Sequence, residues 1–211
     1  MDECCGGTGG ESRGGDLGYR AVLWIALGLN AGMFAVELVA SLVAGSVSLQ
    51  ADALDFLGDA ANYAVGLVVL GLALRWRARA ALGKGLVMGA FALWVVISTV
   101  DHAIAAIPPR AEIMSAVGLL ALAANFSVAA LLFRYRRGDS NRRSVWLCTR
   151  NDALGNGAVI LAGIGVYYSG TPWPDLAVAA VIATLGLSSA FQVIRHARTE
   201  LRAAVRVMAE S

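Results

Sequence analysis

The chain has 211 residues, of which 58% are hydrophobic and 15% charged, and its mean hydropathy is +0.66. Soluble domains are roughly 45–50% apolar and about 25% charged. The composition therefore excludes an ordinary soluble protein and predicts an all-α integral membrane protein, with the lipid bilayer as a partner and no nucleic acid. The net charge of +2 indicates little, because the distribution of charge along the chain matters more.

The N-terminal segment, residues 1–18, is polar and rich in glycine. Such a composition predicts a disordered tail. Cys4 and Cys5 in this tail either capture metal on the cytoplasmic side or have no specific role. Vicinal cysteines rarely bridge one another, and Cys148 falls inside an apolar stretch, so no disulfide framework is expected.

Six apolar stretches follow, and each is long enough for a transmembrane helix of about 20 residues. We expect the helices at residues 19–44, 47–74, 85–107, 113–133, 144–168 and 176–193. A basic loop is expected at residues 75–84 and another at 134–143. The six-helix domain then occupies residues 19–194, and residues 195–211 form a short basic tail.

The orientation follows from the positions of Lys and Arg. Of the 17 basic residues, 14 lie in the N-terminal segment, the two basic loops and the C-terminal segment, and Arg20 is at the start of the first predicted helix. Only Arg110 falls on the opposite side, and Arg150 lies within a helix. Cytoplasmic segments of membrane proteins are enriched in Lys and Arg. We therefore predict that both termini are cytoplasmic.

Three aspartates interrupt the second stretch: Asp52, Asp55 and Asp59. With about 3.6 residues per turn, they lie along one side of a helix. Each charge at the bilayer centre costs about 2.5–3.5 kcal/mol on insertion scales, so such residues usually face a cavity and mark a functional site.

The fifth stretch carries a second pair at the same spacing, Cys148 and Asp152. Together with Asp55 and Asp59 it provides four ligands, which suits a tetrahedral divalent cation. A thiolate with carboxylate oxygens is compatible with Zn²⁺ or a softer ion such as Cd²⁺. These groups must release protons to bind a metal, so the set predicts exchange of metal for protons.

Other interpretations of these four residues remain open. Asp55 and Asp59 could pair with Arg150 or share a proton with each other. Cys148 could be a small buried apolar residue, as free cysteines often are.

Several further polar residues occur near the predicted site. Asn30, Glu37 and Asn156 are expected to support the ligands or helix packing rather than bind metal. Asp101 and His102, near the far end of the third stretch, either relay protons or metal at the outer mouth or form an interfacial pair that reaches water. His196 lies among arginines and is expected to be solvated.

Several of these motifs together resemble those of a known family. Asn30 and Glu37 are followed by SVSLQADALDFLGD at 46–59 and by CTRNDALGN at 148–156. Their order and spacing are similar to the paired metal-binding motifs of the cation diffusion facilitators. The resemblance covers all six predicted helices.

The resemblance implies a homodimeric metal/proton antiporter in which helices one, two, four and five surround the site. Asp55 and Asp59 match the first ligand pair, and Cys148 and Asp152 match the second. Asp52 falls in the family's ADA segment and so has a supporting role. The usual histidine is Cys148 here, which favours a softer ion. The histidine-rich loop of many members and the C-terminal cytoplasmic domain are not found in the sequence, so we expect a short form.

We therefore expect a secondary transporter of the inner (plasma) membrane, not an enzyme, that exports Zn²⁺, Cd²⁺ or a similar ion and requires no cofactor. An alternative is a non-transporting metal-binding protein that partners a full-length transporter. An intramembrane hydrolase using Asp55 and Asp59 fits poorly, because a substrate could not lie between two acids on one helical turn.

Overall fold

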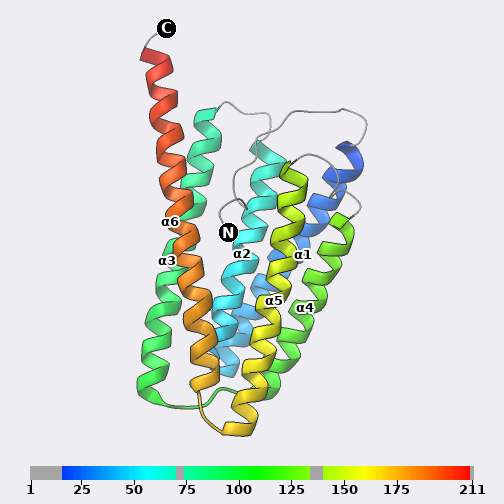
Figure 1. Ribbon diagram of the computed structural model, residues 1–211, viewed down its shortest axis with the longest axis vertical. Helices are drawn as coiled ribbons and strands as arrows, with labels where there is room; N and C mark the ends of the chain where they lie inside the picture. The colour runs from blue at the N-terminus through cyan, green and yellow to red at the C-terminus, as the bar shows by residue number, and fades with distance from the viewer. Residues whose placement is uncertain (1–15, 70–73, 134–139, 210–211) are drawn as a thin grey trace.

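The computed structural model describes residues 16–69, 74–133 and 140–209. Along these residues the chain forms six helices and no strand (Figure 1): α1 (Asp16–Ala44), α2 (Val47–Val69), α3 (Leu74–Ala105), α4 (Ala111–Phe133), α5 (Ser140–Ser169) and α6 (Trp173–Ala209). The all-α prediction is confirmed. The tail with Cys4 and Cys5, and residues 134–139 of the second basic loop, lie outside the described residues.

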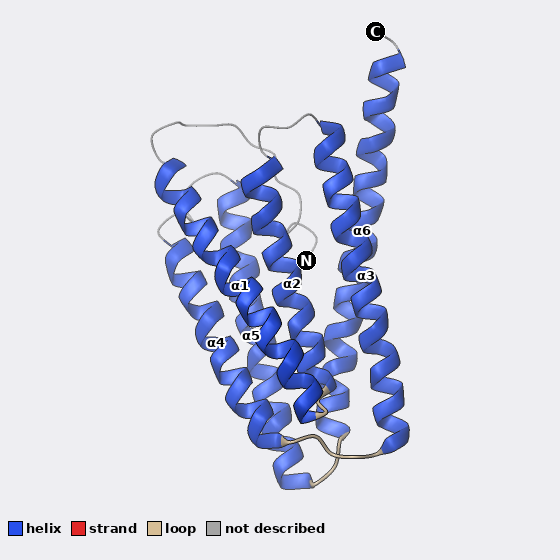
Figure 2. Cartoon of the chain, turned by 180° about the vertical axis from the view of Figure 1, so that it is seen from behind, coloured by secondary structure: helices blue, strands red, loops and turns tan. Residues whose placement is uncertain are grey.

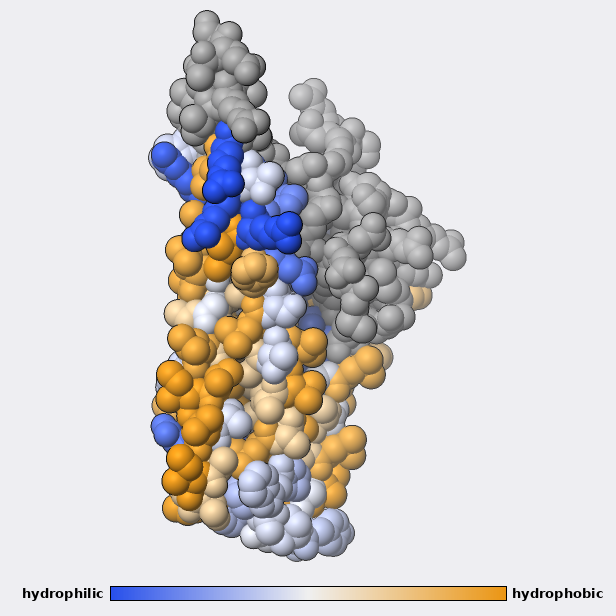
Figure 3. Space-filling view, turned by 60° about the vertical axis from the view of Figure 1, so that its left-hand side comes forward, coloured by the Kyte–Doolittle hydropathy of each residue, from blue (hydrophilic) through white to orange (hydrophobic). Residues whose placement is uncertain are grey.

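Large hydrophobic side chains are exposed along α1, α3, α4, α5 and α6. Figure 3 shows hydrophobic side chains over the lower and middle part of one face and strongly hydrophilic ones at its upper end. In the described chain, α1, α3, α4 and α6 each contain a segment long and apolar enough to cross a bilayer. Soluble monomers rarely expose contiguous apolar surface of this extent. These observations confirm a multi-pass membrane protein.

Helix α2 differs because the polar residues of its first two turns lie within the bundle. On α5, Asn156 is buried and Asp152 is partly exposed. α2 contacts α1, α3, α5 and α6, and every residue from Ser46 to Leu54 is buried. Figures 1 and 2 show α3 and α6 side by side on one flank, with α1, α4 and α5 on the other side of α2. α1 begins and α6 ends at the same end of the bundle (Figure 1), as an even number of crossings requires.

Several predicted boundaries change in the structure. α1 begins at Asp16 and α5 at Ser140, so residues 16–18 of the expected disordered tail and residues 140–143 of the expected loop are helical. The loop expected at residues 75–84 is wrong, because α3 already begins at Leu74. Arg, Ala, Leu and Lys favour helix, and no proline interrupts the segment. α6 continues to Ala209 rather than ending near Val193, so the basic segment at 195–209 is helical as well, and Ala197 is buried within it.

The start of α2 is capped by a residue from α6. The buried carboxylate of Asp175 accepts hydrogen bonds from Ser46 Oγ (2.7 Å), Val47 N (2.9 Å) and Ser48 N (3.1 Å). Ser46 Oγ in turn accepts a hydrogen bond from Leu49 N at 3.2 Å. The first backbone N–H groups of a helix lack partners within the helix, and a negative charge at this end is favourable. Asp175 therefore fixes the helix that carries the three aspartates.

We expect Asp175→Ala to lower stability by about 2–4 kcal/mol, because it removes one helix cap and leaves buried donors without an acceptor. Thermal melts of the detergent-solubilised protein, followed by circular dichroism, would measure this. Glu112→Ala is a matched control, since Glu112 is an exposed carboxylate in the first turn of α4. Equal melting temperatures for the two variants would contradict the assigned cap.

Glycines set the distance between α2 and its neighbours α3 and α6. A methyl group added at Gly58 would lie 2.8 Å from Met88 Cε of α3, and one added at Gly186 would lie 2.6 Å from Leu54 Cδ2. Real side chains do not approach this closely. Glycine at both positions therefore leaves room for the side chains of Met88 and Leu54 where these helices meet.

Candidate functional site

The three aspartates of α2 become more exposed along the helix. Asp52 is 1% exposed, whereas Asp55 and Asp59 are partly exposed. The carboxyl group of Asp55 lies close enough to those of Asp52 and Asp59 to interact electrostatically with both. The predicted alignment of the three acids along one helix is confirmed.

α5 brings Asp152 to this face. The carboxyl groups of Asp152 and Asp59 lie within hydrogen-bond reach of each other, and Asp55 is also in electrostatic range of Asp152. A methyl group at Gly155 of α5 would lie 3.9 Å from Asp52 Oδ1 and 3.9 Å from Asp55 Oδ2. Three of the four predicted ligands therefore converge between α2 and α5.

The fourth predicted ligand, Cys148, is one helical turn before Asp152 in α5, but its side chain lies outside the described residues. Within the described part of the chain, no group of three or more His, Cys, Asp or Glu residues is arranged to hold a metal ion. The four-ligand set therefore stays a prediction, with the metal as cargo rather than as a resident cofactor.

A second carboxyl pair lies between α1 and α2. Glu37 is fully buried, and its carboxyl group is within hydrogen-bond reach of that of Asp52. Neither oxygen of Glu37 has a donor partner in the described chain. Glu37 and Asp52 thus form an acidic pair that is separate from Asp59 and Asp152.

Buried amides extend this polar interior. Asn30 Nδ2 donates to the Ala26 carbonyl at 2.8 Å, but its Oδ1 has no partner among the described residues. The same holds for both amide atoms of Asn156, and for the side-chain oxygens of Gln50 and Asn125. Buried polar groups are normally hydrogen-bonded, so these side chains suit an interior that accommodates water or ions.

Sequence reasoning assigned roles to Asn30, Glu37, Asp52 and Asn156 but not to Gln50 or Asn125. Asn125 is a lone polar residue in an otherwise apolar helix, which is the signal that could have identified it. The structure adds both residues to the polar interior of α1, α2, α4 and α5.

Two other predicted groups lie away from these acids. Asp101 is exposed, and His102 Nδ1 donates to the Ser98 carbonyl of its own helix at 2.8 Å. At about 1.5 Å per residue they lie roughly 25 Å along α3 from Lys84, which is the α3 residue in electrostatic range of Asp59. Their role as an outer relay stays a prediction.

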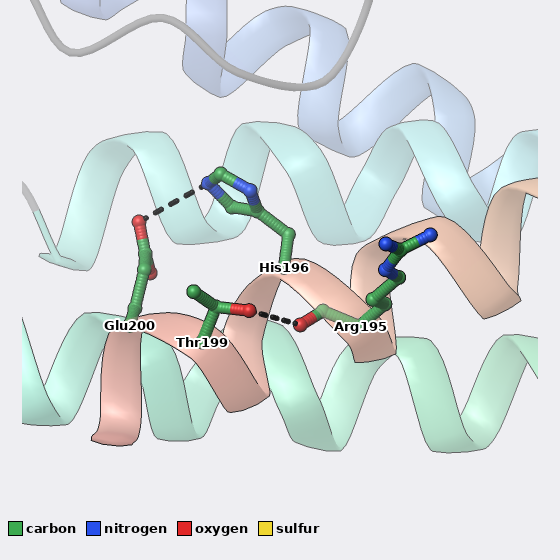
Figure 4. Close-up of polar contacts among 4 residues, drawn as sticks. All are labelled: Arg195, His196, Thr199 and Glu200. Carbon is green, nitrogen blue, oxygen red and sulfur yellow. Dashed lines mark hydrogen bonds and ion pairs between the residues drawn. The ribbon is translucent and has the colours of Figure 1, made fainter. Parts of the chain in front are cut away.

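His196 lies at the opposite end of the bundle, on α6. Its Nε2 is 3.4 Å from Glu200 Oε1, and the histidine side chain is 71% exposed. Figure 4 shows this pair beside the Thr199 hydroxyl, which donates to the Arg195 carbonyl at 3.1 Å. The expectation of a solvated histidine is confirmed.

Residues 23–201 match the cation efflux transmembrane domain. The chain belongs to the cation diffusion facilitator family. This is a family of membrane transporters, and the expected resemblance is confirmed.

Two curated relatives are both described as a cadmium, cobalt and zinc/H(+)-K(+) antiporter. The one from Bacillus velezensis is 24% identical over 192 residues, and the one from Bacillus subtilis is 23% identical over 192 residues. Each alignment covers 83% of this chain and 61% of the relative. The chain thus spans about three fifths of the length of the curated relatives it matches.

Proposed function

We propose that this cation diffusion facilitator exports a divalent heavy-metal ion, Zn²⁺, Cd²⁺ or a similar cation, from the cytoplasm in exchange for protons. Membership of the family and the names of the two Bacillus relatives support metal/proton antiport. The observation that carries the proposal is the convergence of Asp55 and Asp59 with Asp152 inside a bundle whose exterior is apolar.

The proposed ligands are Asp55 and Asp59 from α2, and Cys148 and Asp152 from α5. Two carboxyl groups in contact require a proton or a cation between them. Asp59 and Asp152 thus hold either proton or metal, and exchange of one for the other couples the two fluxes. Because the ligands come from two helices, movement of α2 against α5 changes access to the ion, as in alternating-access transporters.

Residues around the ligands fit supporting roles in this scheme. Asp52 and Glu37 lie on the side of the site toward the start of α2, where Asp175 fixes the helix end. Asn156 is one turn beyond Asp152 on α5 and is buried. We propose that these groups position the ligands and hydrate the ion rather than bind it directly.

We also propose that the protein lies in the inner (plasma) membrane with both termini cytoplasmic, and that it acts as a homodimer. Residues 19–194 form the transmembrane domain. Light scattering of the detergent-solubilised protein would test the dimer, and a molar mass of one chain at all concentrations would contradict it.

Flux measurements in proteoliposomes test the proposed function directly. Purified protein is reconstituted, Zn²⁺ or Cd²⁺ is supplied on one side, and metal uptake is followed with an encapsulated fluorescent chelator. We expect uptake that rises with an opposing proton gradient and falls when a protonophore dissipates it. Metal binding without gradient-dependent flux would instead favour the alternative of a non-transporting metal-binding partner.

A further inference from the structure

One turn of α3 is fixed tightly between α2 and α6. Met88 Cε occupies the space that a side chain at Gly58 of α2 would need. On the α6 side, a methyl group at Gly85 would lie 2.8 Å from Ile194 Cγ1 and 3.1 Å from Val193 Cγ1. This turn of α3 therefore packs closely against both α2 and α6.

Lys84 lies on this turn. It precedes Met88 by four residues, so the two side chains share one face of α3. On the facing helix, Asn62 follows Gly58 by four residues. Because α2 and α3 run in opposite directions (Figure 1), Lys84 and Asn62 meet one turn beyond the Met88–Gly58 contact. The ammonium group of Lys84 donates a hydrogen bond to Asn62 Oδ1.

This contact places a positive charge next to the proposed metal site. Asn62 is three residues after Asp59, one turn along the same helix, and the Asp59 carboxylate lies within electrostatic range of the Lys84 ammonium. Lysines near helix ends commonly extend to water. Lys84 is instead only partly exposed, and its ammonium is directed to α2.

We propose that Lys84 is a tethered counter-charge that sets the metal affinity of the site and limits how tightly the ion is held. Its ammonium offsets the negative charge of the acids while no metal is bound. It repels a divalent cation at Asp59, which favours release of the ion and hence turnover. Asn62 is the positioning residue that holds the ammonium beside the site.

This inference rests on the proposed function, since it takes Asp59 as a metal ligand. Repulsion between a unit charge and a divalent ion a few ångströms apart is large enough to change affinity about tenfold, even at the effective dielectric constant of a protein surface. We therefore expect Lys84→Gln to bind Zn²⁺ and Cd²⁺ about tenfold more tightly. Lys84→Arg retains the charge and is expected to stay close to the original protein.

The test is calorimetric titration of the purified full chain with Zn²⁺ and, separately, Cd²⁺. Arg79→Gln is the matched control, because Arg79 is an exposed α3 residue whose guanidinium lies 5.0 Å from the Trp76 ring. It removes the same charge away from Asp59 and is expected to change the Kd less than about twofold. In flux assays, Lys84→Gln is expected to lower KM and also lower the maximal rate, since tighter binding slows release.

An unchanged or weaker Kd in Lys84→Gln, or an equal effect of Arg79→Gln, would overturn the role of Lys84. If Lys84→Gln does not fold, Asn62→Ala tests the same idea. It keeps the ammonium but removes its anchor, so a smaller increase in affinity is expected, and an unchanged Kd overturns the proposal. Failure of the proposed function is recognised by a different result: Asp59→Asn would then bind metal as tightly as the original protein.

Discussion

Asp59→Asn is expected to reduce proton-coupled metal flux at least about 100-fold. The substitution keeps the size of the side chain but removes the carboxylate that lies against Asp152. Changes to groups around metal ligands alone cost roughly 10–100-fold in affinity or activity, so loss of a ligand that also exchanges protons has a larger effect. Reconstituted flux with a fluorescent metal chelator measures the result.

Glu112→Gln provides the matched control for this experiment. It also replaces a carboxylate by the amide of the same size, at an exposed position in the first turn of α4, and flux within about twofold of the original protein is expected. Asp152→Asn should resemble Asp59→Asn, and the double variant should be no worse than either alone, because groups that act as one unit are not additive. Wild-type flux in Asp59→Asn would exclude the assigned site.

The acidic half of the site on α2 could be predicted because its signal is local. Asp55 and Asp59 are one helical turn apart, so any helix through this segment places them on one face. Charges in an apolar sequence are conspicuous because burying them is costly. The structure adds the contact with Asp152, which depends on how α5 lies against α2 and cannot be derived from the spacing within either helix.

Contacts between distant segments could not be predicted. No role was assigned to Asp175 from the sequence, yet it caps a helix that begins 128 residues earlier in the chain. Its role depends on α6 starting beside the first turn of α2. Nothing in the local sequence of either segment specifies that arrangement.

The start of α3 could not be predicted for a different reason. Arg75, Arg77, Arg79 and Lys84 were expected in a loop because charge density usually marks the end of an apolar span. These residue types also favour helix, and the helix continues beyond the apolar segment. Because Lys84 is part of α3, the helix orients its ammonium group toward Asn62 and Asp59 of α2.

Cys148→His is expected to shift metal preference from Cd²⁺ toward Zn²⁺ by about tenfold, equivalent to roughly 1.4 kcal/mol in relative binding free energy. A thiolate is a softer ligand than an imidazole, and Zn²⁺ commonly binds histidine nitrogen together with carboxylate oxygens. The substitution also restores the residue that the resembling family motif has at this position. Titration of the purified variant with each ion gives the ratio of the two Kd values.

Replacing Cys4 and Cys5 together with serine is the control for cysteine content. If those thiols do not bind the transported ion, this double variant is expected to change the Cd²⁺-to-Zn²⁺ ratio of Kd values by less than about twofold, as for independent sites. A ratio that stays constant in Cys148→His while Asp59→Asn still abolishes flux would exclude Cys148 as a ligand. The site would then depend on carboxylates, which favour harder ions than Cd²⁺.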